Sequence, residues 1–211
     1  RLFSEFIQVG GDNADGVGWV AKRTALAPLI NQGRGTTNTT ITNSIFMPYT
    51  DETNVTTYPP RPIGNHGVQP AVRDIRIVGN KFKNIIRQDS SPQQSWLEIP
   101  TVDGVHISDN SFIYTHDTHN FSPSMPSVTI IALRGDSSSG GVDILNNTFD
   151  ITIPDGIYVN VINNLASGSV VSVIGNVFKC AAEFSDIIGL NAPCDDIKVI
   201  GNSVVSTGRR F

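Results

Sequence analysis

Cysteine, charge and long apolar runs are scarce in this chain of 211 residues, and each shortage excludes a class of protein. Two cysteines, Cys180 and Cys194, are too few for the disulfide framework of a small secreted domain, although a single bridge between them stays open. No run of about 18 apolar residues occurs, so no segment is expected to insert into a membrane. The apolar residues also lack the spacing of an amphipathic helix, which argues against a helical protein.

Charged residues make up only 16% of the chain, and the formal net charge is −4. No cluster of Lys and Arg forms a basic patch, so nucleic acid is not an expected partner. Hydrophobic residues make up 39% of the chain. This composition is typical of one all-β domain with a long and narrow core.

A short pattern occurs six times along the chain. It reads apolar, any, apolar, any, a small or polar residue, Asn, any, Phe. Its occurrences are 26 to 37 residues apart, and repeats at such distances indicate a solenoid. The six segments are TTITNSIF (39–46), DIRIVGNKF (74–82), GVHISDNSF (104–112), GVDILNNTF (141–149), VVSVIGNVF (170–178) and DIKVIGNSV (196–204).

The apolar residues of these segments alternate with period two and include many Val and Ile, which predicts β-strands. Turn residues separate the segments from further strands, which we expect at 95–99, 127–133, 156–162 and 185–190. The sequence therefore predicts an all-β, right-handed parallel β-helix of about six or more coils. We expect a single domain over 1–211, with regular coils at 38–204 and a preceding coil or coils in 1–37. We also expect it to be part of a longer β-helix.

Two columns of the repeat are interpreted as scaffold. The Asn position is expected to take the left-handed or bridging backbone conformation of the bend and to stack into an amide ladder. The Phe position is expected to point inward and to stack on the next coil. The Asn column holds Ser44, Asn80, Asn110, Asn147, Asn176 and Asn202, and the Phe column holds Phe46, Phe82, Phe112, Phe149, Phe178 and Val204.

Two further columns are predicted to face outward, because side chains alternate along a strand. The second of them is largely aliphatic, which indicates contact with a loop, a terminal segment or a neighbouring subunit. A homotrimer packed side by side is one such arrangement, and a local bend that turns these residues inward is the alternative. The first column is Thr40, Arg76, His106, Asp143, Ser172 and Lys198, and the second is Thr42, Val78, Ser108, Leu145, Ile174 and Ile200.

The repeated strand, Gly-Asn, Asp-Asn or Asn-Asn, and Phe over 38–204 resembles the pectin-lyase-like superfamily of right-handed parallel β-helices. The low charge, the richness in Asn, Thr and Ser and the long loops are most similar to phage tailspikes and related polysaccharide depolymerases. The resemblance implies a polysaccharide as partner and a location outside the cell or on a virion surface. It implies no cofactor, although calcium bound by loop carboxylates stays open.

The stretch GGDNADGVGW (10–19) carries the first candidate for catalysis. Glycoside hydrolysis uses two carboxylates, and Asp12 and Asp15 are three residues apart. NADGV is similar to the Asn-Thr-Asp-Gly stretch of polygalacturonases, which implies that Asp15 is the acid. The neighbouring Asp-Asp motif of that family is absent from the following coil, and no Arg-Ile-Lys motif follows. An ordinary Asp-Gly turn is the alternative.

A second candidate lies on the first outward column. A polysaccharide lyase needs a cation to neutralise the sugar carboxylate and a base to remove a proton. Arg76 and His106 are suited to these roles, and Arg73 and Asp103 are candidates for substrate binding on the same face. A solvated sheet surface without a site is the alternative.

Three long connections, at 47–73, 83–94 and 113–126, follow the Phe position in successive coils and are expected to wall a groove. His66, within GNHG, and His116 and Asp117, within THDTH, are candidates for substrate binding. A metal clip in THDTH is a weaker alternative, and no metal site is predicted. Trp96 could stack on a sugar ring or pack in the core.

These features together predict a protein that binds and cleaves a polysaccharide. Hydrolysis is favoured over lyase chemistry, because carboxylates outnumber well-placed basic residues. The alternative is a structural or adhesive β-helix that has no active site.

Overall fold

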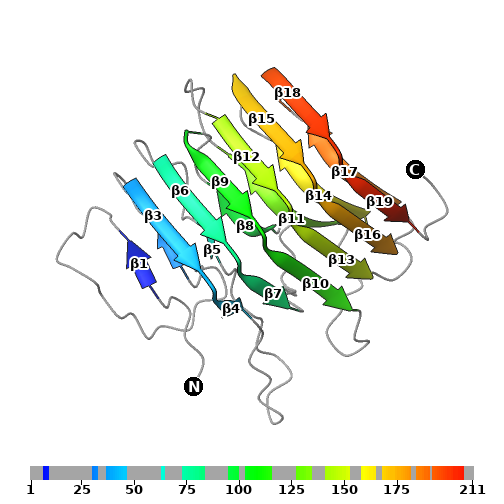
Figure 1. Cartoon of the computed structure of the whole chain (residues 1–211), viewed down its shortest axis with the longest axis horizontal. Helices are drawn as coiled ribbons and strands as arrows, with labels where there is room; N and C mark the ends of the chain where they lie inside the picture. Colours follow the sequence, from blue (N-terminus) through cyan, green and yellow to red (C-terminus); the bar gives the residue numbers. More distant parts are fainter. Residues whose placement is uncertain are drawn as a thin grey trace, which may run out of the picture.

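The computed structural model describes residues 7–9, 30–32, 37–46, 63–64, 73–83, 95–99, 103–115, 127–134, 141–152, 158–164, 168–181, 184–190 and 192–206. All regular elements in these ranges are β-strands. They form three sheets, which we call A, B and C, and every pairing within them is parallel (Figure 1).

The strands are assigned to the sheets as follows. Sheet A contains β1 (Ile7–Val9), β2 (Ile30–Gln32), β5 (Ile63–Gly64), β8 (Ser95–Ile99), β11 (Ser127–Leu133), β14 (Tyr158–Asn164) and β17 (Phe184–Leu190). Sheet B contains β3 (Thr37–Thr42), β6 (Arg73–Val78), β9 (Val105–Ser108), β12 (Gly141–Leu145), β15 (Ser169–Ile174) and β18 (Cys194–Ile200). Sheet C contains β4 (Ile45–Phe46), β7 (Lys81–Lys83), β10 (Ser111–Thr115), β13 (Thr148–Thr152), β16 (Val177–Ala181) and β19 (Ser203–Ser206).

The chain visits the three sheets in a fixed order. A strand of sheet A is followed by one of sheet B and one of sheet C, and this cycle repeats from β2–β3–β4 to β17–β18–β19. Each strand pairs with the strand one coil before it and the strand one coil after it, so the coils are stacked (Figure 1). This order of three all-parallel sheets confirms the predicted parallel β-helix of about six coils.

The corner between sheets B and C is the most regular part of each coil. We expected its Asn to take the left-handed or bridging conformation, and the structure gives the left-handed conformation to the residue before the Asn. Every coil has a positive φ there, between 51° and 67°, which only Gly, Asn and Asp adopt readily. The residues are Asn43, Gly79, Asp109, Asn146, Gly175 and Gly201. The following Asn is thereby turned inward, where its carboxamide can bond to the neighbouring coils.

The inward carboxamides form the predicted amide ladder. In the middle of the stack, the backbone N–H and Nδ2 of Asn110 donate to Oδ1 of Asn147, at 2.9 and 3.0 Å. Asn147 donates in the same way to Asn176, at 2.8 and 3.0 Å. Its Nδ2 also donates to the carbonyl of Ile107. These side chains are buried, so the ladder satisfies polar groups that would otherwise be costly inside the protein.

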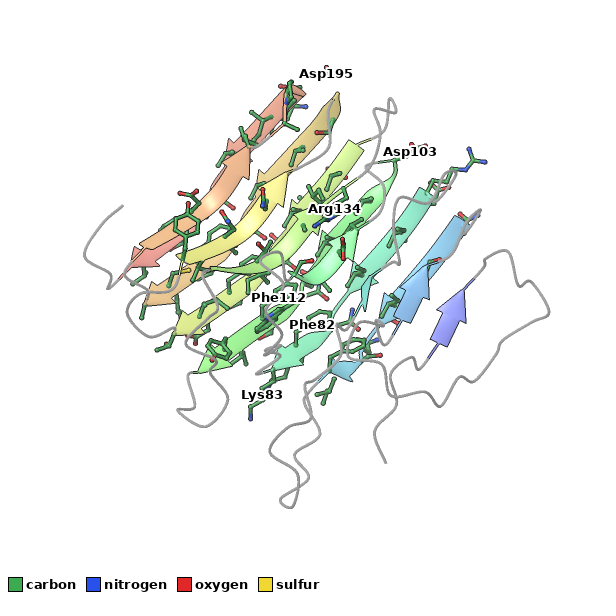
Figure 2. All side chains as sticks on the ribbon, turned by 180° about the vertical axis from the view of Figure 1, so that it is seen from behind. Phe82, Lys83, Asp103, Phe112, Arg134 and Asp195 are labelled. Carbon is green, nitrogen blue, oxygen red and sulfur yellow. The ribbon has the colours of Figure 1, made fainter. Side chains whose placement is uncertain are left out.

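The Phe column forms a second ladder beside the first. The rings of neighbouring coils stack with centroids 4.8 or 4.9 Å apart and with interplanar angles of 4° to 7°. Figure 2 shows Phe82 and Phe112 next to each other on adjacent strands. The ring spacing equals the usual spacing of paired strands, so each ring lies on the ring of the next coil. The stacked residues are Phe46, Phe82, Phe112, Phe149 and Phe178.

Sheet A departs from strict alternation at one position in each coil. Ile130 and Ile131 are consecutive, yet both are fully buried in the same hydrophobic core. Thr129 and Ile131 pair in register with Ser95 and Leu97, whereas Ile130 has no paired partner. A local bend at this position accounts for two neighbouring side chains that point inward. Trp96 and Leu97 occupy the equivalent place in β8 and belong to the same core.

The two cysteines are not bridged. Cys180 lies on β16 in sheet C and is buried, while Cys194 lies on β18 in sheet B and is half-buried. Burial raises the pKa of the Cys180 thiol to about 11, and the charge of Asp150 adds to this shift. Cys180 therefore serves as a small core residue.

Candidate functional site

The outer face of sheet B carries a row of charged side chains. Ile75 and Ile77 are fully buried on β6, so Arg76 between them points outward, and it is exposed. Arg76 pairs in register with His106, and His106 pairs in register with Asp143. Paired strands are about 4.8 Å apart, which makes these three side chains immediate neighbours. We call Arg76, His106 and Asp143 the charged row.

His106 is held by a neighbour on its own strand. Its Nε2 lies 3.1 Å from Oγ of Ser108, which is buried at the end of β9. A neutral imidazole has one N–H and one free lone pair. If Nε2 carries the proton and donates to Ser108, the lone pair of Nδ1 can accept a proton from a ligand. The Ser108 contact thus orients the ring for acid–base chemistry.

The strand ends of sheet B bring further charges close to the row. The backbone N–H of Asp74 donates to the carbonyl of Asp103 at 3.0 Å, so these residues of successive coils are adjacent. A Cβ at position 104 would lie 2.7 Å from Oδ1 of Asp74, which is too close. Because residue 104 is a glycine, there is room for that carboxylate. Arg73 is exposed beside Asp74. Figure 2 shows Asp103 at the start of its strand.

The second outward column runs alongside the charged row. Val78, Leu145 and Ile174 are half-buried and Ile200 is exposed. Leu145, Ile174 and Ile200 align across neighbouring strands, and the buried Ser108 lies in register between Val78 and Leu145. None of the four aliphatic residues belongs to the hydrophobic core or packs against it. The structure therefore favours the outward orientation over the inward bend. We call Val78, Leu145, Ile174 and Ile200 the aliphatic strip.

Sheet A presents polar pairs that were not predicted from the sequence. Nε of Arg134 lies 2.7 Å from Oε1 of Glu98, and burial lowers the pKa of Arg134. The Tyr158 hydroxyl donates to Asp186 on the next coil. Burial, followed by the hydrogen bond and the charge of Asp186, raises the pKa of Tyr158 to about 12. No signal in the sequence pointed to these pairs, because none of the four residues belongs to the repeated pattern.

Several predicted site residues lie outside the residues that the structure describes. They include both proposed hydrolase carboxylates and the loop residues, namely Asp12, Asp15, His66, His116 and Asp117. Almost all of the three long connections also lies outside them. Trp96 is described and is only 4% exposed. Its ring packs edge to face against Tyr114, with ring centroids 6.3 Å apart. Trp96 is therefore a core residue and is not exposed for stacking on a sugar ring.

Two features are absent from the described part of the chain. No three His, Cys, Asp or Glu side chains within it come together in a way that could hold a metal ion. No helix in the same residues is long and apolar enough to cross a membrane.

Comparison with protein-family models, with curated proteins and with solved structures finds no significant match. The proposed function therefore rests on the fold and on the side chains of the outer face of sheet B.

Proposed function

We propose that the protein is a carbohydrate-active β-helix that binds a polysaccharide along the outer face of sheet B and cleaves it. The observation that carries this proposal is the register of Arg76, His106 and Asp143 on three successive coils. Stacked coils repeat every ~4.8 Å, so this face offers a periodic surface to a periodic polymer.

The chemistry of the face suits a sugar chain. Arg76, Asp143 and Arg73 are exposed and can bond to hydroxyl or carboxylate groups of a glycan. The aliphatic strip lies two residues further along the same strands and can contact the apolar faces of pyranose rings. A polymer that presents hydroxyl groups and C–H surfaces together matches this arrangement better than a purely charged or purely apolar ligand does.

Cleavage by hydrolysis is the favoured reaction, with Asp15 as the acid and Asp12 as its partner carboxylate. A retaining mechanism needs carboxyl groups about 5 Å apart, and an inverting mechanism needs roughly 6.5–9.5 Å. Lyase chemistry is the second candidate, favoured by the register pairing of Arg76 with His106 on the neighbouring strand. In that reaction Arg76 would neutralise the sugar carboxylate and His106 would remove the proton.

A panel of bacterial capsular and O-antigen polysaccharides, with pectate and alginate, tests the proposal. Reducing ends and the ultraviolet absorbance of unsaturated sugars are followed together. Reducing ends alone are expected, and Asp12→Asn and Asp15→Asn should then abolish them. Both signals would establish the lyase, and loss of activity in His106→Ala with retained binding would assign the base.

The alternative is a structural or adhesive module that binds a surface glycan without cleaving it. Binding to a glycan of the panel with neither signal would favour this alternative. No binding and no product for any glycan would contradict the proposal as a whole.

The setting that fits this activity is the cell exterior or the surface of a virion, as in a depolymerase of the tailspike type. In that setting a homotrimer packed through the aliphatic strip is the alternative to contact of the strip with the glycan, because residues buried between copies cannot also line the glycan-binding face. Val78, Leu145 and Ile174 are the residues that such packing would bury. A monomer by light scattering at micromolar concentration would exclude the trimer but would leave glycan binding untouched.

A further inference from the structure

The first outward column of sheet B changes in exposure from coil to coil. Arg76, Asp143 and Lys198 are exposed, whereas His106 and Ser172, which lie between them in register, are half-buried. The imidazole of His106 is held toward its own strand by its serine contact, and the side chain of Ser172 is short. Charged side chains therefore project from every second coil of this face.

The sign of the projecting charge alternates along the stack. Arg76 and Lys198 are cationic, and Asp143 lies midway between them, because β6, β9, β12, β15 and β18 are consecutive in sheet B. The coils are 4.8 or 4.9 Å apart at the phenylalanine ladder. Opposite charges are therefore about 10 Å apart, and the two cations are about 19 Å apart. We call Arg76, Asp143 and Lys198 the charge triplet.

The two cationic sites of the triplet are built alike. Asp-Ile-Arg at 74–76 and Asp-Ile-Lys at 196–198 occupy equal positions of the repeat, with an aspartate two residues before the cation. The carboxylate of Asp74 lies against the next coil. Nζ of Lys198 is 3.7 Å from Oδ2 of Asp196, and both side chains are 55% exposed. Contacts between exposed ions are weak in water, so this one leaves the ammonium group able to bind a ligand.

A uniformly charged polymer does not match the triplet. A polyanion would bring like charge to Asp143, and a polycation would bring like charge to both Arg76 and Lys198. An uncharged glycan would offer only hydroxyl and amide groups, which form weaker hydrogen bonds than groups of opposite charge do. A polymer with alternating charges pairs all three side chains at once.

We propose that the glycan bound along sheet B is zwitterionic, with one anionic and one cationic group in each repeating unit. This inference rests on the proposed function and names its substrate class. The repeating unit extends about 19 Å along the stack, so the anionic groups of successive units bind Arg76 and Lys198. The amino group between them binds Asp143. Because the two cationic sites are in phase with the polymer, binding at one raises the local concentration of ligand at the other.

A zwitterionic capsular polysaccharide, whose tetrasaccharide repeat carries one free amino group and one carboxylate, is the probe. Two chemical derivatives of the same polymer serve as matched ligands. N-acetylation removes its positive charge, and reduction of the carboxylates removes its negative charge. Affinity for the full chain is measured by affinity electrophoresis at neutral pH and low salt. Each derivative should bind at least about threefold more weakly than the native polymer.

Two charge-removing variants assign the contacts to the triplet. Asp143→Asn should weaken binding of the native polymer about three- to fivefold, and should change binding of the N-acetylated polymer less than about twofold. Lys198→Gln should likewise weaken binding of the native polymer but not that of the carboxyl-reduced polymer. Lys179 is an exposed lysine on sheet C, so Lys179→Gln is the matched control and should change none of the affinities.

The outcomes separate this inference from the proposed function. Equal binding of all three polymer forms, weakened alike by Arg76→Ala/His106→Ala, would overturn the zwitterionic ligand and leave glycan binding on sheet B intact. Equal losses for native polymer and derivative in Asp143→Asn or Lys198→Gln would overturn the pairing as well. If no form binds while a neutral or uniformly charged glycan does, only this inference is contradicted. If no glycan binds at all, the proposed function is contradicted with it.

Discussion

The coil of β12 and β13 and the coil of β18 and β19 have the same sequence pattern but different surroundings. Asn147 bonds to the coils on both sides, and Phe149 stacks between two rings. Within the residues that the structure describes, Asn202 bonds only to the preceding coil, and Val204 takes the place of Phe with an exposed side chain. In a solenoid, the stabilising energy of a residue comes from its two neighbouring repeats, so equal positions in the pattern are unequal in energy.

The largest difference is expected at the Phe column. Phe149→Ala removes a fully buried ring and two stacking contacts, which should lower the free energy of unfolding by about 3–5 kcal/mol. Val204→Ala removes an exposed side chain and should change it by less than about 0.5 kcal/mol. Urea unfolding followed by circular dichroism measures both. Equal losses would show that the last coil is covered as the middle coil is.

The Asn ladder should give the next largest contrast. Asn147→Ala removes the acceptor for both donors of Asn110 and leaves them buried, with an expected loss of about 2–4 kcal/mol. Asn202→Ala acts at the half-buried end of the ladder and should cost about 1 kcal/mol. The same unfolding experiment compares the two variants. A loss of unfolding free energy for Asn202→Ala as large as that for Asn147→Ala would show that Asn202 also bonds to coils on both sides.

The smallest contrast concerns two glycines with the same backbone conformation. Gly175 and Gly201 have φ of 67° and 63°, so alanine costs about 1 kcal/mol at either position. A Cβ on Gly175 would also lie 2.6 Å from Oδ1 of Asn146, while a Cβ on Gly201 meets nothing within 4 Å. Gly175→Ala should therefore cost about twice as much in thermal unfolding. If Gly201→Ala costs as much, contact with Asn146 is not the cause.

The repeat pattern was sufficient to predict the strands of sheet B, four strands of sheet A, their stacking and both ladders, because each depends on periods that can be read locally. Two details were not predictable in this way. The left-handed residue at the corner precedes the Asn, since only then does the carboxamide reach the core. The bend in sheet A depends on whether Ile130 and Ile131 can both reach one interior, which is a property of the closed coil.

The candidate site also contains features that the repeat pattern predicted and features that it did not. The neighbours in the charged row followed from the register of the repeat, because equal positions of successive coils must align. Two other contacts could not be predicted from the register, namely that of His106 with Ser108 and that of the Asp74 carboxylate with Gly104. They depend on side-chain rotamers and on a positive φ at Asp74. Residues on the long connections have no repeat to align them, so their positions could not be derived from the pattern.

The most direct test of the central claim compares two double variants on different faces of the same coils. Arg76→Ala/His106→Ala changes the outer face of sheet B, and Lys81→Ala/Lys83→Ala removes two exposed charges from sheet C as the control. Affinity for the glycan identified by the panel is measured for both by affinity electrophoresis, with unfolding midpoints checked. The first variant should bind at least about tenfold more weakly, because hydrogen bonds to charged groups contribute about 1.5–3 kcal/mol each. The control should change less than twofold. Equal weakening in both variants, or none in the first, would contradict binding along the charged row.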